Sequence, residues 1–462
     1  MTLIKSISGI RGTIGGTVGE GLSPLDVVKF VAAFGYWIKE RSDGEETTMI
    51  IGRDARISGK MVSGLAISTL QGLGIDVIDL GLSTTPTVEM AVIHEAAAGG
   101  IILTASHNPK EWNALKLLNG KGEFISGAEG LEVLAIAEAE SFSFAEVDDL
   151  GSVTVDESWI DKHIEKVIGL PNIDKEAISD KNFKVVIDCV NSTGGISLPP
   201  LLRALGVSEV VELYCEPNGI FPHNPEPLPE HLTELAEKVK ATGADVGFSV
   251  DPDVDRLAIV SNNGEMFGEE YTLVAIADYV LGSNPGATVS NLSSSRALRD
   301  ITEKHGQKHF ASAVGEVNVV EMMKAENAVI GGEGNGGIIA PELHYGRDAL
   351  VGIALFLSHL ARVGLTCSEL RATYPEYHMS KNKIELTPNI DVNKILELMA
   401  SKYQDENVST IDGVKIDFAE EWVHLRKSNT EPIIRVYSES GSPESAQSLA
   451  QRIIDDVTDL VQ

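Results

Sequence analysis

Three successive parts of this chain repeat one pattern: a short apolar run, a loop of small residues and then a helix-like segment. The clearest apolar runs are Thr48–Asp54, Phe183–Asp188 and Ala287–Leu292. The order strand, loop, helix is typical of α/β layers built on a mainly parallel sheet. Because the pattern recurs in separate portions, we expect a repeated domain rather than one large sheet.

The pattern changes near Tyr374–Pro375. After this point Lys383–Leu386, Val414–Phe418 and Trp422–Leu425 are expected strands, and a last helix is expected to begin near Glu444. These elements predict a smaller α+β domain at the C-terminus. The expected domains are residues 1–155, 156–256, 257–372 and 373–462.

The chain carries 37 basic and 68 acidic side chains, so its formal net charge at pH 7 is −31. This charge repels the phosphates of nucleic acids and of anionic membranes, and we expect neither as a partner. Cys189, Cys215 and Cys367 lack the spacing of a zinc site, which predicts reduced thiols in the core. The N-terminus shows no signal-peptide pattern and no apolar run reaches the ~18 residues of a membrane span, so we expect a cytoplasmic protein.

Three aspartates alternate directly after the apolar stretch Val246–Val250, in the run DPDVDR at residues 251–256. Carboxylates spaced in this way on a tight turn can converge on one cation, and Mg²⁺ prefers carboxylate oxygens together with a substrate phosphate oxygen. A solvated acidic turn is the plain alternative, but the position at the end of a buried strand favours the metal. A calcium EF-hand is excluded, because Arg256 stands where that loop needs glycine. The predicted metal ligands are Asp251, Asp253 and Asp255.

The run TASHNP, residues 104–109, follows the apolar stretch Gly100–Leu103. A serine at a strand exit, followed by Asn-Pro, lies where the chain turns sharply and exposes a side chain. Ser106 is therefore a candidate nucleophile, although a turn serine that caps its own backbone explains this run alone better. A Ser–His hydrolase is disfavoured, because the run lacks a G-x-S-x-G elbow and adjacent side chains of an extended chain point apart.

Lys116 follows Ser106 at a distance of ten residues, between Leu115 and Leu117 in an expected short strand. A lysine with apolar neighbours can have a lowered pKa and can then exchange a proton with a hydroxyl. The same pattern also fits the polar face of a hairpin, so both interpretations stay open.

Glycine dominates the run Gly331–Gly337 (GGEGNGG), which follows the strand-like stretch Asn327–Ile330. The run contains the letters G-x-G-x-x-G of a dinucleotide site, but the next residues, Ile-Ile-Ala-Pro, do not open a helix, so the phosphate-binding geometry is missing. A glycine-rich loop with Glu333 and Asn335 suits a sugar instead, because these side chains accept from and donate to vicinal hydroxyls.

Cations gather in the run Arg426–Pro432 (RKSNTEP), and Arg435 follows in the expected strand beyond it. Guanidinium groups, hydroxyls and backbone N–H groups on one turn can bind a phosphate. Clustered cations are notable in a chain with a net charge of −31. Arg11, Arg53 and Arg56 add further arginines in turns next to glycine.

These four runs, in this order and spacing, resemble the α-D-phosphohexomutase family over the whole chain. That family comprises phosphoglucomutase, phosphomannomutase and phosphoglucosamine mutase. TASHNP is similar to its phosphoserine loop, DPDVDR to its metal loop, GEGNGG to its sugar loop and RKSNTEP to its phosphate loop. The resemblance implies an α/β protein of four domains around a central cleft: three related α/β domains with mixed, mainly parallel sheets and a C-terminal α+β domain.

The resemblance also implies roles for the matching residues. Ser106 would carry the phosphoryl group, Arg11 and Lys116 would flank it, and Lys116 would be a candidate for proton transfer. The ligands of Mg²⁺ would be Asp251, Asp253, Asp255 and Ser106. The residues that bind the substrate would be Arg256, Glu333, Asn335, Arg426, Ser428, Asn429, Thr430 and Arg435. A hexose 1,6-bisphosphate would act as the activator, and the protein would be a monomer or a homodimer.

The chain departs from many bacterial members of the family at four positions. Those members have serine at the position of Asn335 and histidine at that of Gly337, and Pro252 and Val254 replace residues that are often glycine. Without the histidine, Lys116 would carry more of the acid–base work. The Asn-Gly-Gly version is more similar to archaeal-type members.

The resemblance implies interconversion of hexose 6-phosphate and hexose 1-phosphate through a phosphoserine and a bisphosphorylated sugar. We expect glucosamine phosphate as the substrate of a phosphoglucosamine mutase, with a dual-specificity phosphoglucomutase/phosphomannomutase as the alternative. A metal-dependent sugar phosphatase is a further alternative. The possible phosphate-binding run at residues 426–435 argues against the phosphatase. A mutase needs such a separate site for the phosphate that is not transferred, in a cleft closed to water, whereas a phosphatase does not.

Overall fold

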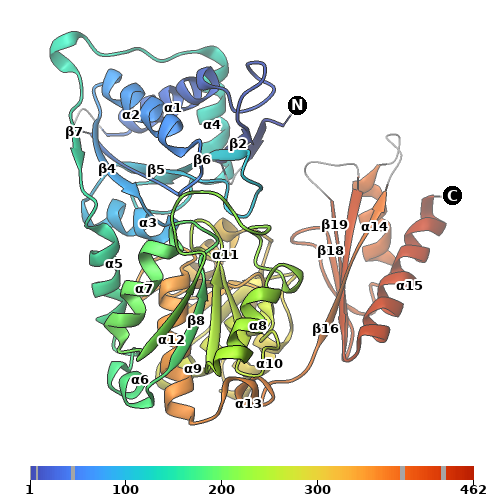
Figure 1. The fold of residues 1–462 in the computed structure, drawn as a ribbon. Coiled ribbons are helices and arrows are strands. Elements are labelled where there is room, and N and C mark those ends of the chain that lie inside the picture. The colour runs from blue at the N-terminus through green and yellow to red at the C-terminus, as the bar shows by residue number, and fades with distance from the viewer. Residues whose placement is uncertain (1, 7–8, 43–46, 386–390, 428–432, 462) are drawn as a thin grey trace.

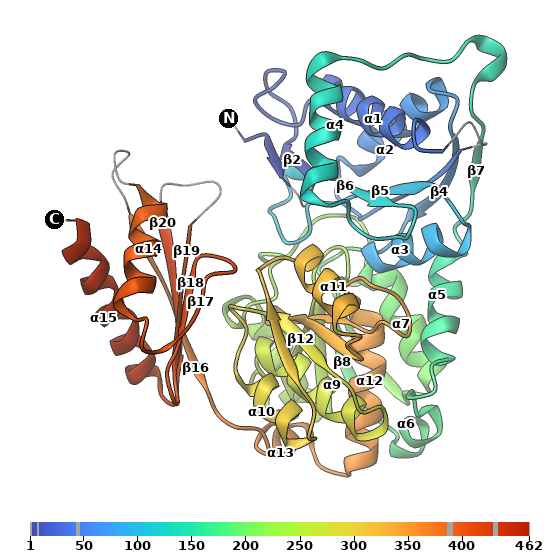
Figure 2. The ribbon, with the colours of Figure 1, turned by 180° about the vertical axis from the view of Figure 1, so that it is seen from behind.

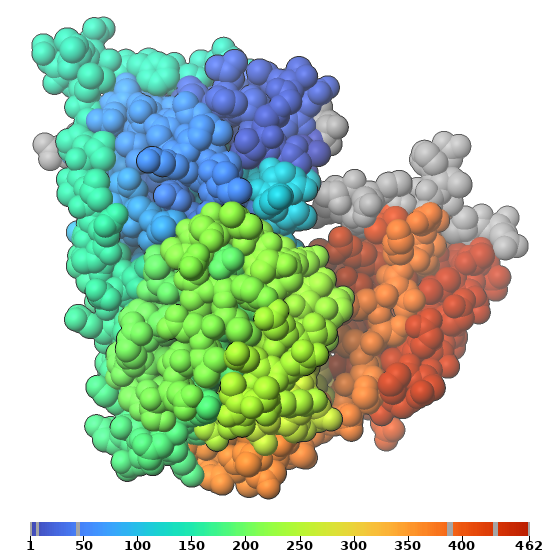
Figure 3. Space-filling view, viewed as in Figure 1, coloured from blue at the N-terminus to red at the C-terminus, as the bar shows by residue number. Residues whose placement is uncertain are grey.

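The computed structural model describes residues 2–6, 9–42, 47–385, 391–427 and 433–461. The chain forms four sheets, one after another along the sequence. Three units with parallel strands make one body, and the C-terminal unit stands beside it (Figures 1 and 2). Figure 3 shows the C-terminal unit against the side of this body.

The first sheet has the strand order β1-β2-β6-β5-β3-β4-β7. The strands β5, β3, β4 and β7 run parallel, whereas β6, β2 and β1 are antiparallel to their neighbours. The strands are β1 (Ile4–Ser6), β2 (Gly9–Thr13), β3 (Thr48–Arg53), β4 (Asp76–Leu82), β5 (Gly99–Leu103), β6 (Trp112–Asn119) and β7 (Val153–Val155). The helices are α1 (Pro24–Lys39), α2 (Gly59–Gly72), α3 (Thr85–His94) and α4 (Gly127–Ala139).

Alternating apolar residues on the first sheet bury both of its faces, because successive side chains of a strand point to opposite sides. Met49 and Ile51 share a core with α1, α2 and α4, whereas Ile50 packs with α3 on the other face. Figure 1 shows α3 between this sheet and the second unit. The loops around α3 are therefore placed at the junction of the units.

The second sheet has the order β11-β10-β8-β9, with β10, β8 and β9 parallel and β11 antiparallel to β10. Its strands are β8 (Lys184–Asp188), β9 (Glu209–Leu213), β10 (Val246–Val250) and β11 (Leu257–Ser261). Its helices are α5 (Trp159–Ile168), α6 (Lys175–Lys181), α7 (Gly194–Leu205) and α8 (Thr233–Thr242). β11 extends this sheet past the domain limit expected at residue 256, because the chain turns back beside β10 after the aspartate run.

The third sheet has the order β13-β12-β14-β15, again with an antiparallel last strand. Its strands are β12 (Thr288–Asn291), β13 (His309–Ser312), β14 (Ile330–Glu333) and β15 (Gly337–Ile339). Its helices are α9 (Glu269–Ser283), α10 (Ala297–Lys304), α11 (Glu316–Ala325), α12 (Ala349–Val363) and α13 (Cys367–Arg371). The second and third units share one apolar core, in which Phe248 of β10 meets Phe356 of α12 edge to face.

The glycine-rich run lies partly in a strand, which differs from the loop that its composition predicts. β14 begins at Ile330 and includes Gly331, Gly332 and Glu333. A Cβ at Gly331 would lie 2.5 Å from the sulfur of Met323 and 2.8 Å from the Val289 carbonyl oxygen. Glycine therefore lets the backbone of β14 pack closely between α11 and β12, which a sequence pattern does not reveal.

The C-terminal sheet is antiparallel throughout, in the order β16-β20-β19-β18-β17. Its strands are β16 (His378–Glu385), β17 (Asn407–Ser409), β18 (Val414–Asp417), β19 (Trp422–Lys427) and β20 (Ile433–Ser440), and its helices are α14 (Val392–Lys402) and α15 (Pro443–Val461). The expected strands are present, although β16 begins earlier than predicted, and Leu386 lies outside the described residues. Ion pairs and hydrogen bonds join this unit to the third unit, including Ser293 Oγ to His424 Nδ1 at 2.9 Å.

The three parallel-stranded units place their polar runs at equivalent points. In each unit a parallel strand turns into an antiparallel partner: β5 into β6, β10 into β11, and β14 into β15. TASHNP, DPDVDR and the end of the glycine run occupy these three turns. The repeated topology therefore brings chemically different turns to the carboxyl ends of parallel strands, where α/β folds usually bind ligands.

The described ranges contain no helix whose length and apolar character would let it cross a membrane. All three cysteines are free thiols; Cys189 and Cys367 are buried as predicted, and Cys215 is half-buried.

Candidate active site

Ser106 is held in an unusual backbone conformation at the turn between β5 and β6. Its φ is +50°, in the left-handed region, and its N–H donates to Thr104 Oγ1 at 2.9 Å. Its Oγ donates to Asp251 Oδ2 at 2.6 Å, so the turn of the first unit meets the aspartate turn of the second. Non-glycine residues at positive φ are uncommon and often belong to functional sites.

Arg56 organises this turn, a role that its sequence position did not reveal. In the sequence Arg56 is only one more arginine in a turn next to glycine, whereas in the structure it is 1% exposed and pairs with Asp54 at 3.0 Å. Its two terminal nitrogens donate to four carbonyl oxygens of the Ser106 turn, which belong to Ser106, Asn108, Pro109 and Trp112. Because the guanidinium group is rigid and its donors are all used, it fixes the path of this turn.

The three aspartates of the DPDVDR run lie together and are fully buried. Asp253 Oδ2 accepts from Thr85 Oγ1 at 2.6 Å and from Lys116 Nζ at 2.7 Å. Within the described part of the chain, Oδ1 of Asp253 and Oδ1 of Asp255 have no hydrogen-bond partner. Buried carboxylate oxygens without donors are costly unless a cation is bound, so the residues present fit a divalent metal ion such as Mg²⁺.

The pKa shifts of the aspartates also favour a bound cation. Burial raises the pKa of Asp251 well above its usual range, and the charges of Asp255 and Asp253 raise it further. Burial also acts on Asp255, but the cations Arg347, Lys116 and Arg256 hold its pKa below the usual range. Like charges this close repel strongly in a buried site, and a bound dication relieves that repulsion.

The sequence hypothesis of a lowered pKa at Lys116 is wrong for this structure. Burial does lower the pKa, as the apolar neighbours suggested, but Asp253 at 2.7 Å and Asp255 at 3.4 Å raise it above the ordinary lysine value. These partners come from a different unit of the fold, so neighbours in the sequence could not reveal them. Lys116 is a buried cation at the aspartate cluster, and it contacts Oδ2 of Asp253 and of Asp255, which leaves both Oδ1 atoms without a donor among the described residues.

Arg347 is a site residue that the sequence analysis missed. It follows the glycine run, before α12, and its guanidinium contacts three carboxylates: Asp255 at 2.7 Å, Glu316 at 3.0 Å and Glu333 at 3.0 Å. It therefore joins the aspartate turn to the sugar-loop glutamate. A lone arginine after a Pro-Glu-Leu-His segment carries no pattern that would have singled it out.

Glu333 is almost buried and has partners for both oxygens. Oε1 accepts from Asn291 Nδ2 at 3.0 Å and from the Gly315 N–H at 3.2 Å, and Oε2 accepts from Arg347. Asn335 Oδ1 accepts from the Gly337 N–H at 3.2 Å. The carboxylate orientation is therefore set by the protein before any ligand binds.

Two adjoining cavities bring the candidate residues together. A cavity of about 330 Å³ is lined by Arg11, Ser106, Lys116, Arg256, Glu333, Asn335 and Arg347, among others. A second cavity of about 400 Å³ shares His107, Arg256, Glu333 and Asn335 with the first and reaches Arg426 and Arg435 of the C-terminal unit. The candidates Ser428, Asn429 and Thr430 lie outside the described residues. A ligand with two charged ends could therefore place one end at Ser106 and the other at Arg426.

The sequence matches one protein family along almost its entire length. Residues 3–144, 161–264 and 268–377 match the α/β/α domains I, II and III of phosphoglucomutase/phosphomannomutase, and residues 383–456 match its C-terminal domain.

The chain belongs to the phosphoglucomutase/phosphomannomutase family.

Similar proteins agree with this assignment. A phosphoglucomutase/phosphomannomutase from Thermococcus kodakarensis is 38% identical over 442 residues, covering 94% of this chain and 95% of that protein. A probable phosphoglucosamine mutase from Methanopyrus kandleri is 32% identical over 459 residues and covers 98% of each chain. The crystal structure of a family protein from Burkholderia thailandensis superposes with a TM-score of 0.84 at 26% identity, covering 99% of this chain and 98% of that one. The chain is thus a phosphohexomutase, an isomerase that transfers a phosphoryl group.

His107 is a further residue of the mutase site that the sequence analysis set aside. Its Nδ1 lies 3.4 Å from Ser106 Oγ, because the positive φ of Ser106 brings the adjacent side chains together. Extended-chain geometry, which predicts that they point apart, does not apply here. Burial lowers the pKa of His107 to about 3, so the imidazole is neutral at pH 7 and can accept a proton.

The loop after β9 lines the cavity of about 400 Å³ through Glu226, Pro227 and Leu228. Phe221 lies over the Arg56 guanidinium at 5.1 Å, and Glu226 approaches Arg256 at 3.8 Å. His223 Nε2 contacts Asp188 Oδ2 at 2.9 Å and anchors this loop to the end of β8. Burial would lower the pKa of His223, but its hydrogen bond with Asp188 and the negative charges of Asp188 and Glu234 raise it above the ordinary value.

This raised pKa predicts how substrate binding depends on pH. The ion pair is fully present below the ordinary histidine pKa of about 6.5 and is lost as the pH rises through the higher pKa of the folded state. Losing a charged hydrogen bond worth about 1 kcal/mol is expected to raise KM roughly five-fold. KM measured from pH 5.5 to 9 should rise in the wild type and stay flat and high in His223→Gln. His305→Gln, at a half-buried histidine that contacts Asp278 at 2.7 Å in the third unit, is the control; the same flat profile in both variants would contradict this role.

Proposed function

We propose that this phosphohexomutase interconverts glucosamine 6-phosphate and glucosamine 1-phosphate through phosphorylated Ser106 and a bisphosphorylated sugar. The observation that carries the mechanism is the contact of Ser106 Oγ with Asp251 at 2.6 Å, next to two buried carboxylate oxygens without donors among the described residues. The serine and the cation site of the second unit thus form one reaction centre.

The first transfer moves the phosphoryl group from Ser106 Oγ to the free hydroxyl of the sugar monophosphate. The O–P bond at Ser106 breaks, a new O–P bond forms at the sugar, and the hydroxyl proton leaves while Ser106 Oγ gains one. Lys116 and His107 lie at this end of the cavity; the neutral His107 is the candidate to accept the hydroxyl proton, and the protonated Lys116 is the candidate to donate one to Ser106 Oγ. Arg11, whose Nε has no hydrogen-bond partner in the described ranges, faces the same cavity and can bind the transferring group.

The aspartates of the DPDVDR run would hold Mg²⁺, with an oxygen of Ser106 or its phosphate as a further ligand. When bound, Mg²⁺ offsets negative charge on the phosphoryl group during transfer. The protein supplies alignment, since Asp251 holds Ser106 Oγ and Arg347 orients both Asp255 and Glu333.

The far cavity would bind the phosphate that is not transferred. Arg426 and Arg435 line this cavity at the edge of the C-terminal unit. The proposed binding residues are Arg256, Glu333, Asn335, Arg426, Ser428, Asn429, Thr430 and Arg435. After the first transfer the bisphosphorylated sugar would reorient in the cavity and return its other phosphate to Ser106. A hexose 1,6-bisphosphate would phosphorylate Ser106 again in enzyme that has lost its phosphate.

The choice of sugar is supported by one carboxylate of the far cavity. Among the described residues, four glutamates and four Lys/Arg side chains line this cavity, and Glu269 and Glu333 are already paired with Lys381 and Arg347, so Glu226 is the candidate to accept from an ammonium group at the 2-position. Glu226 is half-buried and only loosely paired, with His107 at 3.9 Å and Arg256 at 3.8 Å, so it is free to accept from that group. The 38% identity with a phosphoglucomutase/phosphomannomutase favours a glucose/mannose mutase as the second candidate.

A parallel assay tests both the reaction and the sugar. Purified protein with Mg²⁺ and a trace of hexose 1,6-bisphosphate is offered glucosamine, glucose and mannose phosphates, and both isomerisation and free phosphate are measured. We expect the highest kcat/KM with glucosamine phosphate and no phosphate release. Glu226→Gln should lower kcat/KM for glucosamine phosphate and leave the neutral sugars nearly unchanged.

Two other outcomes of this assay can be told apart. Preference for glucose or mannose phosphate would replace the substrate and keep the mutase, whereas phosphate release without isomerisation would identify a phosphatase. The cytoplasmic location, the monomeric or homodimeric state and the absence of nucleic-acid and membrane partners stay predictions.

A further inference from the structure

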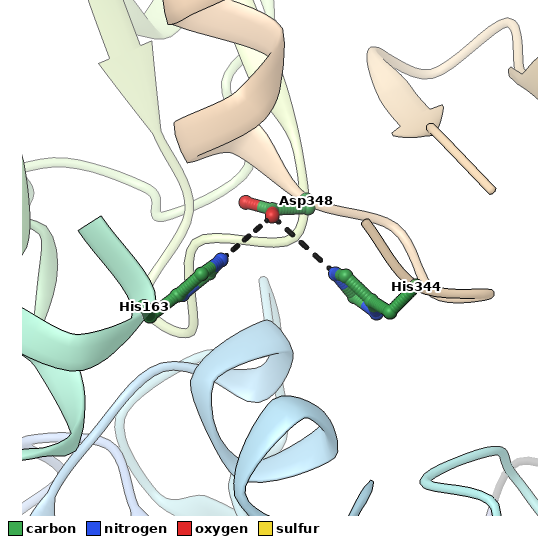
Figure 4. A group of neighbouring side chains, drawn as sticks. All are labelled: His163, His344 and Asp348. Carbon is green, nitrogen blue, oxygen red and sulfur yellow. Dashed lines mark hydrogen bonds and ion pairs between the residues drawn. The ribbon is translucent and has the colours of Figure 1, made fainter. Parts of the chain in front are cut away.

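A second group of potential metal ligands adjoins the aspartate turn but contains none of its residues, at the place where three units of the fold meet (Figure 4). His163 belongs to α5, His344 precedes α12, and Asp348 is the N-terminal cap of α12. All three side chains are at most 1% exposed. The cluster shares no ligand with the Mg²⁺ site proposed above.

The ligand atoms of the cluster have the spacing of a metal site. Asp348 Oδ2 lies 3.0 Å from His163 Nε2 and 3.3 Å from His344 Nε2, and the three atoms lie within 4.8 Å of one another. Ligands held about 2.1 Å from Zn²⁺ in a tetrahedron lie roughly 3.4 Å apart. Figure 4 shows both imidazoles directed at the same carboxylate oxygen.

The second oxygen of Asp348 has a separate task. Asp348 Oδ1 accepts from the N–H groups of Leu350 and Val351 at 2.7 and 3.3 Å, which caps α12 and fixes the carboxylate. Oδ2 is thereby directed at the two histidines. A rigidly held carboxylate of this kind is suited to binding a metal ion through one oxygen.

The outer nitrogen of each histidine faces an oxygen from the same helix. His163 Nδ1 lies 3.0 Å from Thr87 Oγ1, and His344 Nδ1 lies 3.3 Å from Glu89 Oε2; Thr87 and Glu89 both belong to α3. Histidines that bind metals usually donate their other N–H to an oxygen, which fixes the ring and makes the inner nitrogen a better ligand. His163 has this arrangement with Thr87, and the Glu89 carboxyl group lies beside His344 Nδ1, where a small shift would provide the same arrangement.

Glu89 supplies an independent observation. It is 1% exposed, and within the described ranges neither of its oxygens, nor His344 Nδ1, makes a hydrogen bond of good geometry despite the 3.3 Å separation. A Cβ on Gly346 would lie 1.9 Å from Glu89 Oε2, so the chain keeps a glycine where this carboxylate is inserted. Burying a second carboxylate next to Asp348 is costly without positive charge nearby. A divalent cation bound to Asp348 and the two histidines would place positive charge beside this carboxyl group.

We propose that His163, His344 and Asp348 bind a divalent transition metal of the zinc class, with Thr87 and Glu89 orienting the two histidines. Imidazole nitrogens with one carboxylate suit zinc, whereas the all-carboxylate DPDVDR turn suits magnesium. The metal would tie α5 and the start of α12 to α3 of the first unit. Because Arg347 is adjacent to Asp348, this metal would also hold in place the arginine that joins Asp255 to Glu333.

Metal content and spectroscopy of the full chain test the proposal. Protein stripped with a chelator is saturated with millimolar Mg²⁺ to fill the aspartate turn and then titrated with Zn²⁺ or Co²⁺. We expect one tightly bound ion per chain, an absorption spectrum of Co²⁺ with nitrogen and oxygen ligands, and zinc–ligand distances of about 2.0–2.1 Å by X-ray absorption.

Matched variants assign the ion to these residues. His163→Gln and His344→Gln should each lower Zn²⁺ affinity at least about 100-fold. His309→Gln, at a histidine of β13 in the third unit, and Asp253→Asn, in the aspartate turn, should leave Zn²⁺ binding intact. Circular dichroism shows whether each variant folds. The Co²⁺ spectrum of the wild type tests the proposal even where a variant does not fold.

Two results would overturn the proposal. Failure of the Mg²⁺-saturated wild type to bind Zn²⁺ or Co²⁺ stoichiometrically would mean that the cluster is a hydrogen-bonded ion-pair network. Loss of zinc in Asp253→Asn but not in His344→Gln would place the zinc in the aspartate turn instead.

Discussion

Replacing Ser106 with alanine is expected to abolish turnover, with a loss of at least about 10⁴-fold in kcat, as for other removed nucleophiles. The oxygen that would carry the phosphoryl group is absent in the variant, so neither half of the cycle can proceed. The measurement is isomerisation of the preferred hexose phosphate, together with transfer of labelled phosphate to the protein, which should disappear.

The loss should not result from unfolding. Ser106 Oγ contacts Asp251 at 2.6 Å and His107 at 3.4 Å, while Arg56 holds the turn through backbone carbonyls that remain in the variant. Circular dichroism and the melting temperature should stay close to those of the wild type. Ser143→Ala, at an exposed serine, is the control and should be fully active. Wild-type turnover in Ser106→Ala would remove the assignment of the nucleophile.

Asp253→Asn should have the second largest effect, a weaker Mg²⁺ dependence combined with a fall in kcat of roughly 10³-fold. Asp253 Oδ2 is bonded to Thr85 and Lys116, so the amide oxygen of asparagine will keep that position. The amide NH₂ group then takes the place of Oδ1, the oxygen without a donor in the described structure, and it cannot ligate a cation. Mg²⁺ titration of activity measures both effects in one experiment.

Asp245→Asn is the matched control for this change. Asp245 precedes the same strand, β10, but it is exposed and accepts from the Lys184 N–H at 2.8 Å. Its replacement should leave both the Mg²⁺ titration and kcat unchanged. An unchanged Mg²⁺ titration in Asp253→Asn would mean that the cation binds elsewhere.

Local elements and turns of this fold were largely predictable. Val246–Val250 is a strand as predicted, and β8, β12, β18 and β19 lie within two residues of their expected bounds. Periodicity, glycine and proline act over a few residues, so a single sequence carries this information. The glycine run is the exception, because the close packing of β14 on Met323 has no local signature.

The partners of the site residues were much less predictable. Lys116 and Asp253 are 137 residues apart, and Arg347 and Asp255 are 92 apart. The pKa of Lys116 therefore could not be inferred from Leu115 and Leu117. The residues next to Arg347 in the sequence likewise did not indicate that its guanidinium group contacts three carboxylates.

The sequence by itself determined which turns carry a serine, three aspartates, a glutamate–asparagine pair and a cluster of cations, because side-chain identity and turn chemistry are local properties. Only the tertiary structure decided that Arg56 is a buried brace rather than a phosphate ligand, that Lys116 is a stabilised cation, and that His163 faces His344 and Asp348. Burial and long-range electrostatics set those outcomes, and both depend on which units of the fold meet in space.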